Sequence, residues 1–391
     1  MLRVYDAAGN AVETHDHTAS SKRGELLASA ISSFEFMKTR KRSWRIAGAI
    51  ALALLLVAFL VIINEVPLQR GYTPRYGSAD SIASLEQVTL GDLKQWILIR
   101  GADRNNPLVL FLHGGPGMPT MYLAHDFQRE LERSFVVVQW DRRGAGKSFT
   151  AGMSSEQMSV SQEINDTVEL IDQLRARFHQ PKVYMVGFSY GSYLGILVAQ
   201  RVPERLHAYV GIGQLACSET ENRAIQDTWI RERAMRAQDA EAIEELDGKR
   251  PRDREKWLFK YGGEIHSAHS WWPLLWSGLR SPEYTFQDIA NVKRGVDFTV
   301  QNLRYDVIDG SILDNVSTLQ VPAYFFTGRF DYTDPTQCTV RLFEKINAPV
   351  KKLVWFDRSA HFVFLEEPSR FAAEMRRVMQ DTKAFEESRD R

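Results

Sequence analysis

The sequence has no excess of charge of either sign and very little cysteine. Its 391 residues include 49 Lys and Arg against 49 Asp and Glu, whereas a nucleic-acid-binding protein usually carries a net basic field. Two cysteines, Cys217 and Cys338, are too few for a disulfide-built scaffold, an iron–sulfur cluster or a cysteine-built zinc site. The charge balance therefore argues against a nucleic-acid-binding protein, and the low cysteine count excludes the cysteine-rich scaffolds and metal sites. Whether the two cysteines pair with each other stays open.

Internal repeats and low-complexity runs are also missing, so nothing indicates a repeat architecture. With 44% apolar and 25% charged residues, the composition is that of a globular protein and is too apolar for a disordered chain. A chain of this length predicts two or three domains, at about 150 residues per domain.

One segment departs from the average composition. Residues 46–63 (IAGAIALALLLVAFLVII) contain neither a charge nor a strongly polar side chain. As a helix they would extend about 27 Å, close to the hydrocarbon thickness of a bilayer. The basic residues that precede the segment are Lys38, Arg40, Lys41, Arg42 and Arg45. By the positive-inside rule we expect a transmembrane anchor at 46–63, a cytoplasmic tail at 1–45 and the remainder outside the cytoplasm.

The two alternatives to an uncleaved anchor are a buried core helix and a cleaved signal peptide. A buried core helix would normally show a polar face, and this segment has none. A cleaved signal peptide would need small residues before its cleavage site, and residues 64–70 (NEVPLQR) offer none. A translation start at Met37 would shorten the tail and keep its basic flank.

Beyond residue 80 the chain alternates between apolar runs and amphipathic helical segments. The runs are 95–100, 107–112, 135–140, 183–186 and 209–212, and they resume at 323–326 and 352–356. Nearly continuous Val, Ile and Leu separated by helices predicts an α/β fold with a mainly parallel sheet, flanked by helices on both faces. We expect this core at 80–215 and 319–391. Residues 216–318, rich in charge and Trp, predict a mostly helical insertion.

Gly187-Phe188-Ser189-Tyr190-Gly191 is the one G-x-S-x-G motif in the chain. It directly follows the apolar run KVYMV and directly precedes the helical run YLGILVAQ. This strand–turn–helix setting is what a nucleophile elbow requires, so we predict Ser189 to be a catalytic nucleophile.

A serine nucleophile needs a histidine base that a carboxylate orients, in the chain order Ser, acid, His. His361 is the only histidine beyond residue 269, and it follows the last apolar run. Asp331 stands shortly after the preceding run, where the acid is expected. Asp334 is a rival, but it precedes a proline and more naturally caps the next helix. Asp357 is a second rival that reads as a turn residue.

Oxyanion donors are expected after the run 107–112, where the glycine-rich stretch 113–117 (HGGPG) lets the backbone approach a substrate. The second donor is expected to be the N–H of Tyr190, the residue after the nucleophile. Residues 144–148 (GAGKS) resemble the end of a phosphate-binding loop, but Asp141 stands where that motif needs glycine. His266 and His269 lack a third ligand at a sensible spacing. No cofactor and no metal are therefore expected.

The motifs together resemble the α/β-hydrolase fold and, more narrowly, the prolyl iminopeptidase-like serine peptidases. They are HGGPG at 113–117, DRRGAGKS at 141–148, GFSYGS at 187–192, GRFD at 328–331 and SAHF at 359–362. The resemblance implies Ser189, Asp331 and His361 as the triad. It also implies the amides of Gly115 and Tyr190 as the oxyanion hole, and a helical cap at 216–318.

The resulting hypothesis is a membrane-anchored serine aminopeptidase that releases N-terminal proline from short peptides. Family members hold the substrate amine with glutamates of the cap, for which Glu219, Glu221 and Glu264 are the candidates. The alternative is a carboxylesterase or lipase with the same triad, in which Trp271, Trp272 and Trp276 would line an acyl pocket. A catalytically inactive, membrane-tethered binding module is the third hypothesis. The expected partners are therefore a small peptide or ester substrate and a membrane, without nucleic acid; the oligomeric state stays open.

Overall fold

The computed structural model describes residues 4–5, 8, 11–12, 46–47, 50–54, 56, 65–307 and 310–389. The chain divides into two compact units, Met1–Val66 and Pro67–Arg391. In the first unit, β1 (Val4–Tyr5) pairs antiparallel with β2 (Ala11–Val12). Most of the predicted anchor at 46–63 lies outside the described residues, and no helix among those described is long and apolar enough to cross a membrane.

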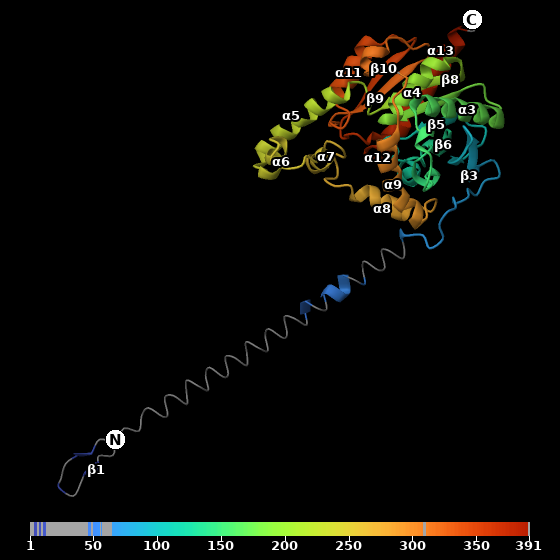
Figure 1. The fold of residues 1–391 in the computed structure, drawn as a ribbon. Helices are drawn as coiled ribbons and strands as arrows, with labels where there is room; N and C mark the ends of the chain where they lie inside the picture. The colour runs from blue at the N-terminus through green and yellow to red at the C-terminus, as the bar shows by residue number, and fades with distance from the viewer. Residues whose placement is uncertain are drawn as a thin grey trace. The chain divides into compact units, whose positions relative to one another are not determined.

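The second unit is built on one eight-stranded sheet (Figure 1). Its strands are β3 (Ile82–Leu90), β4 (Leu93–Gly101), β5 (Leu108–Leu112), β6 (Val136–Asp141), β7 (Val183–Phe188), β8 (Leu206–Ile212), β9 (Ala323–Gly328) and β10 (Lys351–Phe356). Their order is β10-β9-β8-β7-β5-β6-β4-β3. Strand β4 is antiparallel to both neighbours, and every other pair is parallel. The predicted mainly parallel sheet is confirmed.

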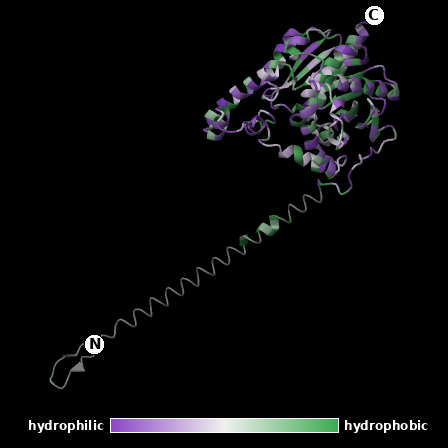
Figure 2. Ribbon diagram, viewed as in Figure 1, coloured by the Kyte–Doolittle hydropathy of each residue, from purple (hydrophilic) through white to green (hydrophobic). Residues whose placement is uncertain are grey.

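Helices cover both faces of the sheet, and alternate residues of a strand therefore enter different apolar clusters. Leu108 and Leu110 of β5 pack into one cluster with α3 (Val160–Phe178), α4 (Tyr190–Arg201) and α11 (Thr336–Lys345). Val109 and Phe111 pack into the other with α2 (Ala124–Phe127), α12 (Val363–Glu366) and α13 (Pro368–Arg389). Figure 2 shows the apolar colouring concentrated in the central strands, with polar colouring on the outer helices. Burial on both faces explains the uninterrupted apolar runs in the sequence.

Strand β3 was not among the predicted strands. It forms a hairpin with β4 around Gly91 and Asp92, whose φ angles of 50° and 64° are those of a tight hairpin turn. Several of its side chains are partly exposed because β3 is the edge of the sheet. An edge strand needs no continuous apolar run, which is why its polar sequence gave a weak signal.

Residues 216–318 contain helices α5 (Glu219–Ala237), α6 (Ala240–Leu246), α7 (Arg254–Tyr261), α8 (Trp272–Arg280), α9 (Phe286–Asn302) and α10 (Ile312–Asn315). The predicted mostly helical character of this insertion is confirmed, and α5 ends at Gln238, which has a φ of 53°. Helices α5 to α7 have a small apolar core of their own, around Trp229, Ile230 and Trp257. Backbone contacts from Gly263 to Tyr332 and from Glu264 to His361 join this cap to the loops after β9 and β10.

A disulfide between Cys217 and Cys338 joins the start of the insertion to α11. The two Cα atoms are 5.6 Å apart although 121 positions separate the residues in sequence. The structure thus decides the pairing that the sequence left open.

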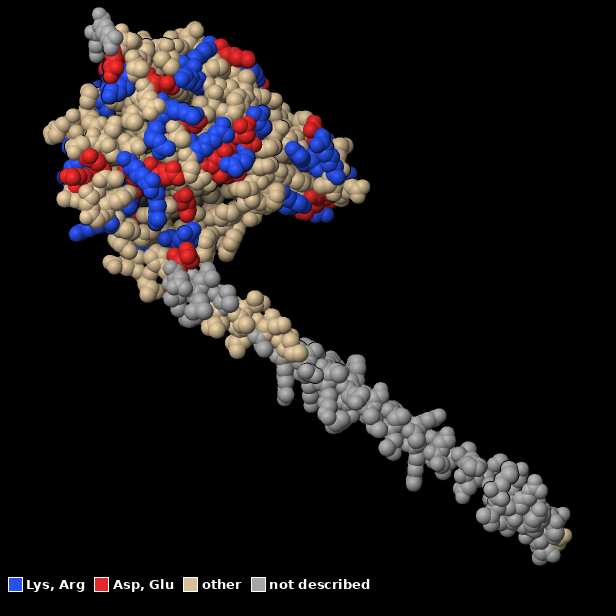
Figure 3. Space-filling model, turned by 180° about the vertical axis from the view of Figure 1, so that it is seen from behind, with Lys and Arg blue, Asp and Glu red and all other residues tan. Residues whose placement is uncertain are grey.

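Charged side chains of both signs are mixed over the face drawn in Figure 3. Among the described residues as a whole, many charged side chains form ion pairs, such as Lys182 with Glu386 at 2.6 Å and Arg254 with Asp227 at 2.7 Å. This distribution agrees with the even charge balance of the sequence.

Candidate active site

The predicted site residues lie in turns that follow strands of the parallel part of the sheet. Ser189 follows β7, Asp331 follows β9 and His361 follows β10. Parallel strands end at the same edge of a sheet, so residues distant in sequence meet there. The loop 113–117 follows β5, which lies beside β7 in the sheet. The nucleophile turn and the predicted oxyanion loop are therefore adjacent.

Ser189 has the backbone conformation of a nucleophile elbow. Its φ of 53° and ψ of −124° are rare for a residue with a side chain. The Ser189 N–H donates a hydrogen bond to the Ile212 carbonyl at 2.8 Å, which holds the turn against β8. The helix that follows spans Tyr190–Arg201 and contains the predicted helical run YLGILVAQ. The strand–turn–helix setting inferred from the G-x-S-x-G motif is confirmed.

His361 and Asp331 are buried and hydrogen-bonded to each other. Nδ1 of His361 lies 2.9 Å from Oδ2 of Asp331. Oδ1 of Asp331 accepts from the backbone N–H groups of Thr333 and Asp334, each at 3.0 Å. The acid is thereby fixed by its own turn and orients the imidazole. Asp357 is exposed and pairs with Arg329, outside the site.

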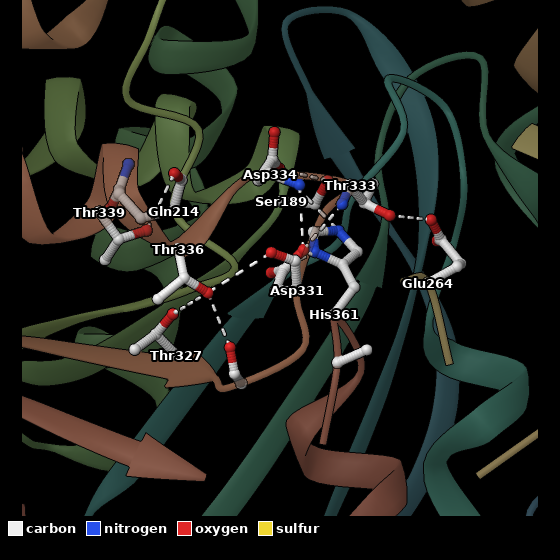
Figure 4. A network of polar contacts seen from close by, with 12 residues as sticks. Ser189, Gln214, Glu264, Thr327, Asp331, Thr333, Asp334, Thr336, Thr339 and His361 are labelled. Carbon is white, nitrogen blue, oxygen red and sulfur yellow. Dashed lines mark hydrogen bonds and ion pairs between the residues drawn. The ribbon is translucent and has the colours of Figure 1, made fainter. Parts of the chain in front are cut away.

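Asp334 occupies the space between the predicted nucleophile and the predicted base (Figure 4). The Ser189 hydroxyl donates to its Oδ2 at 3.3 Å, and the same oxygen lies 3.9 Å from Nε2 of His361. Its Oδ1 accepts from the side-chain amide of Asn222 at 3.4 Å. The prediction that Asp334 caps the next helix is wrong, because no side chain caps α11, whose N-cap residue is Pro335.

Three carboxyl groups surround the one imidazole. Glu264 is the third: its carbonyl accepts from the His361 N–H at 3.0 Å, and its carboxyl accepts from the Thr333 hydroxyl. Burial raises the pKa of Asp334 to about 7 and that of Glu264 to about 6. Burial alone would lower the pKa of His361, but Asp331, Glu264 and Asp334 outweigh it and hold the pKa above its usual value. The site is rich in negative charge.

The loop 113–117 approaches Ser189 closely. A Cβ added to Gly114 would lie 3.0 Å from Cβ of Ser189, so a side chain at this position would press on the nucleophile. His113 joins the loop to the turn at 141–144: it accepts from the Arg142 N–H at 3.2 Å and donates to the Gly114 carbonyl at 3.0 Å. Burial keeps the pKa of His113 well below its usual value, which fits this neutral, accepting role.

Tyr190 is the first residue of α4, where backbone N–H groups lack acceptors within the helix. Its hydroxyl donates to Glu163 at 2.6 Å, so the side chain points away from solvent and is fixed. The N–H groups of Gly115 and Tyr190 remain the predicted oxyanion donors.

The other candidates from the sequence lie elsewhere. Glu219 and Glu221 are on the first turn of α5, where they pair with Arg223 and Arg341. Trp271 and Trp272 are 57% and 56% exposed, so they do not line a buried acyl pocket. His266 stacks on Phe330, and no cluster of metal-binding side chains occurs among the described residues.

The sequence profile described as alpha/beta hydrolase fold matches residues 107–368, about two thirds of the chain. The chain belongs to this family. The hydrolase is 31% identical over 301 residues to the probable aminopeptidase YbaC of Bacillus subtilis (strain 168), which covers 75% of this chain and 95% of the relative. It is 23% identical over 282 residues to a proline iminopeptidase of Thermoplasma volcanium, which covers 69% of this chain and 88% of the relative.

Among solved structures, the proline iminopeptidase of Mycobacterium smegmatis superimposes with a TM-score of 0.56 at 18% identity. The match covers 77% of this chain and 99% of the other. At this identity the likeness supports the fold of the hydrolase alone.

Proposed function

We propose that this hydrolase is a serine aminopeptidase that removes the N-terminal residue, preferably proline, from short peptides. The observation that carries the proposal is the presence of two carboxyl groups, the buried Asp334 and the partly buried Glu264, beyond the one that orients His361. An ester or amide without charge needs no such groups, whereas a substrate with a free N-terminal ammonium is attracted by them. The names of the relatives support the same activity.

In the proposed reaction Ser189 attacks the carbonyl carbon of the N-terminal residue, and His361 takes the hydroxyl proton through Nε2. Asp331 holds Nδ1 and stabilises the imidazolium. The N–H groups of Gly115 and Tyr190 stabilise the oxyanion. His361 then returns the proton to the leaving amine, and water releases the acyl group from Ser189.

A comparison of two substrates tests the proposal. The purified wild-type protein is assayed on a proline arylamide and on a short-chain aryl ester of similar size. We expect a higher kcat/KM on the arylamide, because its free amine meets the acidic site. Cleavage of the ester alone would replace the aminopeptidase by a carboxylesterase with the same triad.

We further propose that residues 46–63 anchor the hydrolase in a membrane, with the N-terminus in the cytoplasm and the catalytic domain outside. The uncharged run and its basic flank support this topology. The disulfide between Cys217 and Cys338 supports it independently, because disulfides persist mainly in oxidising compartments. When a reporter that works only outside the cytoplasm is fused after Arg391, we expect it to give a signal. A signal from a cytoplasm-specific reporter would overturn the topology.

A further inference from the structure

We propose that Asp334 binds the α-ammonium group of the substrate, and that this binding releases the Ser189 hydroxyl from Asp334 so that it can donate to His361. This inference rests on the proposed aminopeptidase function and names the residue that recognises the amine. The resemblance to prolyl iminopeptidases implied cap glutamates for this role, but the carboxyl group that contacts the nucleophile belongs to the turn after β9.

The distance between Asp334 and Ser189 is suited to an N-terminal amine. In an N-terminal residue the α-nitrogen lies about 2.5 Å from the carbonyl carbon, because two bonds separate them. That carbon must come within about 3–3.5 Å of Ser189 Oγ for attack. Oδ2 of Asp334 is 3.3 Å from the same Oγ. A group two bonds from the reacting carbon is therefore within reach of this oxygen.

The position of Asp334 is fixed by its surroundings. Its backbone N–H donates to Oδ1 of Asp331 at 3.0 Å, and Asn222 holds the carboxyl oxygen that faces away from the nucleophile. Among the described residues, no lysine or arginine pairs with Asp334; its one cationic neighbour is His361 at 3.9 Å. Because this pair is longer than a hydrogen bond, it compensates the buried carboxylate only in part. A substrate ammonium would supply a closer cation.

The Ser189 proton links amine binding to catalysis. Without substrate the hydroxyl donates to Asp334, and among the described residues it makes no direct hydrogen bond to His361. An ammonium donates its own protons to Oδ2 and displaces the hydroxyl. The hydroxyl can then turn toward Nε2 of His361 once the imidazole is neutral. The ammonium favours that neutral form, because it offsets the Asp334 charge that helps to raise the pKa of His361. Substrates with a free amine would thus bind more tightly and also meet a better aligned nucleophile.

The decisive variant is Asp334→Asn, which is similar in size and lacks the charge. We expect its kcat/KM on a proline arylamide to fall by about 30-fold or more, mainly through a rise in KM, since a buried charge pair is lost. On the N-acetylated arylamide and on a neutral aryl ester we expect rates within about threefold of wild type. The matched control is Asp357→Asn, which removes an exposed carboxylate outside the site. It should leave kcat/KM unchanged on all three substrates.

Two further measurements separate amine binding from a structural role. The rate of Ser189 labelling by a fluorophosphonate, which has no amine, should be unchanged or faster in Asp334→Asn. Asp334→Glu, which keeps the charge, should restore part of the preference for the free amine. The groups that face Asp334 are His361, Asp331, Glu264 and, more distantly, Tyr305. Since the pKa of Asp334 is about 7, the wild-type preference for the free amine over the acetylated arylamide should rise through that pH, and this rise should be absent in Asp334→Asn.

Three results would overturn the inference. An unchanged ratio of free to acetylated arylamide in Asp334→Asn would show that another group binds the amine. An equal fall of kcat/KM on all substrates, together with slow fluorophosphonate labelling, would make Asp334 a residue that only holds the triad in place. The same result in Asp334→Glu, which keeps the charge, would show that the fold rather than amine binding depends on this position. If wild-type protein cleaves no free-amine arylamide, the proposed function fails as well, so the wild-type assay distinguishes the two failures.

Discussion

The carboxyl edge of the sheet and the helical insertion meet at one site but are built differently. At the edge, Ser189, Asp331 and His361 each stand in a turn directly after a buried strand. The insertion instead has its own apolar core around Trp229 and Trp257, separate from the clusters on the two faces of the sheet. It reaches the site through a few polar contacts from Glu264 and Asn222.

This difference indicates a division of roles in the proposed enzyme. The sheet fixes the atoms that react, because rigid strands determine where each turn lies. The insertion adds charge and shape around them and, together with Asp334 of the turn after β9, selects the substrate. Changes that remove or displace Ser189 or His361 should therefore affect every substrate, whereas changes to the carboxyl groups around them should affect substrates with a free amine.

The largest effect is expected for Ser189→Ala. Without the nucleophile, kcat on both the proline arylamide and the aryl ester should fall by roughly 10⁵–10⁶-fold. Steady-state kinetics measure this loss, and an active-site titration shows whether the variant preparation contains wild-type enzyme. Retention of more than a few per cent of the wild-type rate on either substrate would remove Ser189 from the mechanism.

The next effect is expected for Gly213→Ala, at the end of β8. Gly213 has a φ of 50°, and an added Cβ would lie 2.6 Å from Nδ1 of His361. The imidazole would have to move away from this Cβ, and a misplacement of about 1 Å in a catalytic group lowers kcat by about 10²-fold. Both substrates should lose activity equally. Gly77→Ala is the control, since nothing lies within 4 Å of its added Cβ; a loss confined to one substrate would contradict the division of roles.

A smaller and selective effect is expected for Glu264→Gln in the insertion. Loss of this partly buried charge should raise KM for the arylamide by about 10-fold, equivalent to about 1.4 kcal/mol, and leave KM for the ester unchanged. Because the pKa of Glu264 is raised to about 6, its carboxylate forms as the pH rises through that value. The difference between variant and wild type should therefore shrink below pH 6. Glu219→Gln, on the exposed first turn of α5, is the control and should change neither KM.

The smallest effect on catalysis is expected for Cys217→Ser, which removes the disulfide to Cys338. The free energy of unfolding should fall by about 2–4 kcal/mol, as measured by urea denaturation. Activity at 25 °C should change little, because the reacting groups belong to the sheet. Reduction of the wild-type protein should reproduce the same loss. A large fall in kcat with intact folding would show that the attachment of the insertion controls the triad.

The sequence predicted the sheet edge well, for a physical reason. A strand buried on both faces leaves a continuous apolar run, and an elbow needs small residues around its serine, so the turn at Ser189 and the bounds of α4 are encoded locally. Asp331 and His361 could be placed because each follows such a run. Strand β3 was missed because an exposed edge strand carries no such run.

The acidic surroundings of the triad could not be predicted in the same way. Asp334 precedes a proline, which locally favours a helix cap, and only the packing of three turns places it between Ser189 and His361. Glu264 lies in an insertion without a motif, so nothing in the sequence separates it from Glu219 and Glu221. The pairing of Cys217 with Cys338 depends likewise on contacts between distant segments.

The most direct test of the whole account is the ratio of kcat/KM for a proline arylamide to that for the same arylamide with an acetylated amine, measured on the wild-type protein. Buried carboxyl groups beside the nucleophile predict a preference of about 100-fold or more for the free amine. Equal values for the two substrates would contradict the account, because the negative charge around His361 would then have no part in recognising the substrate.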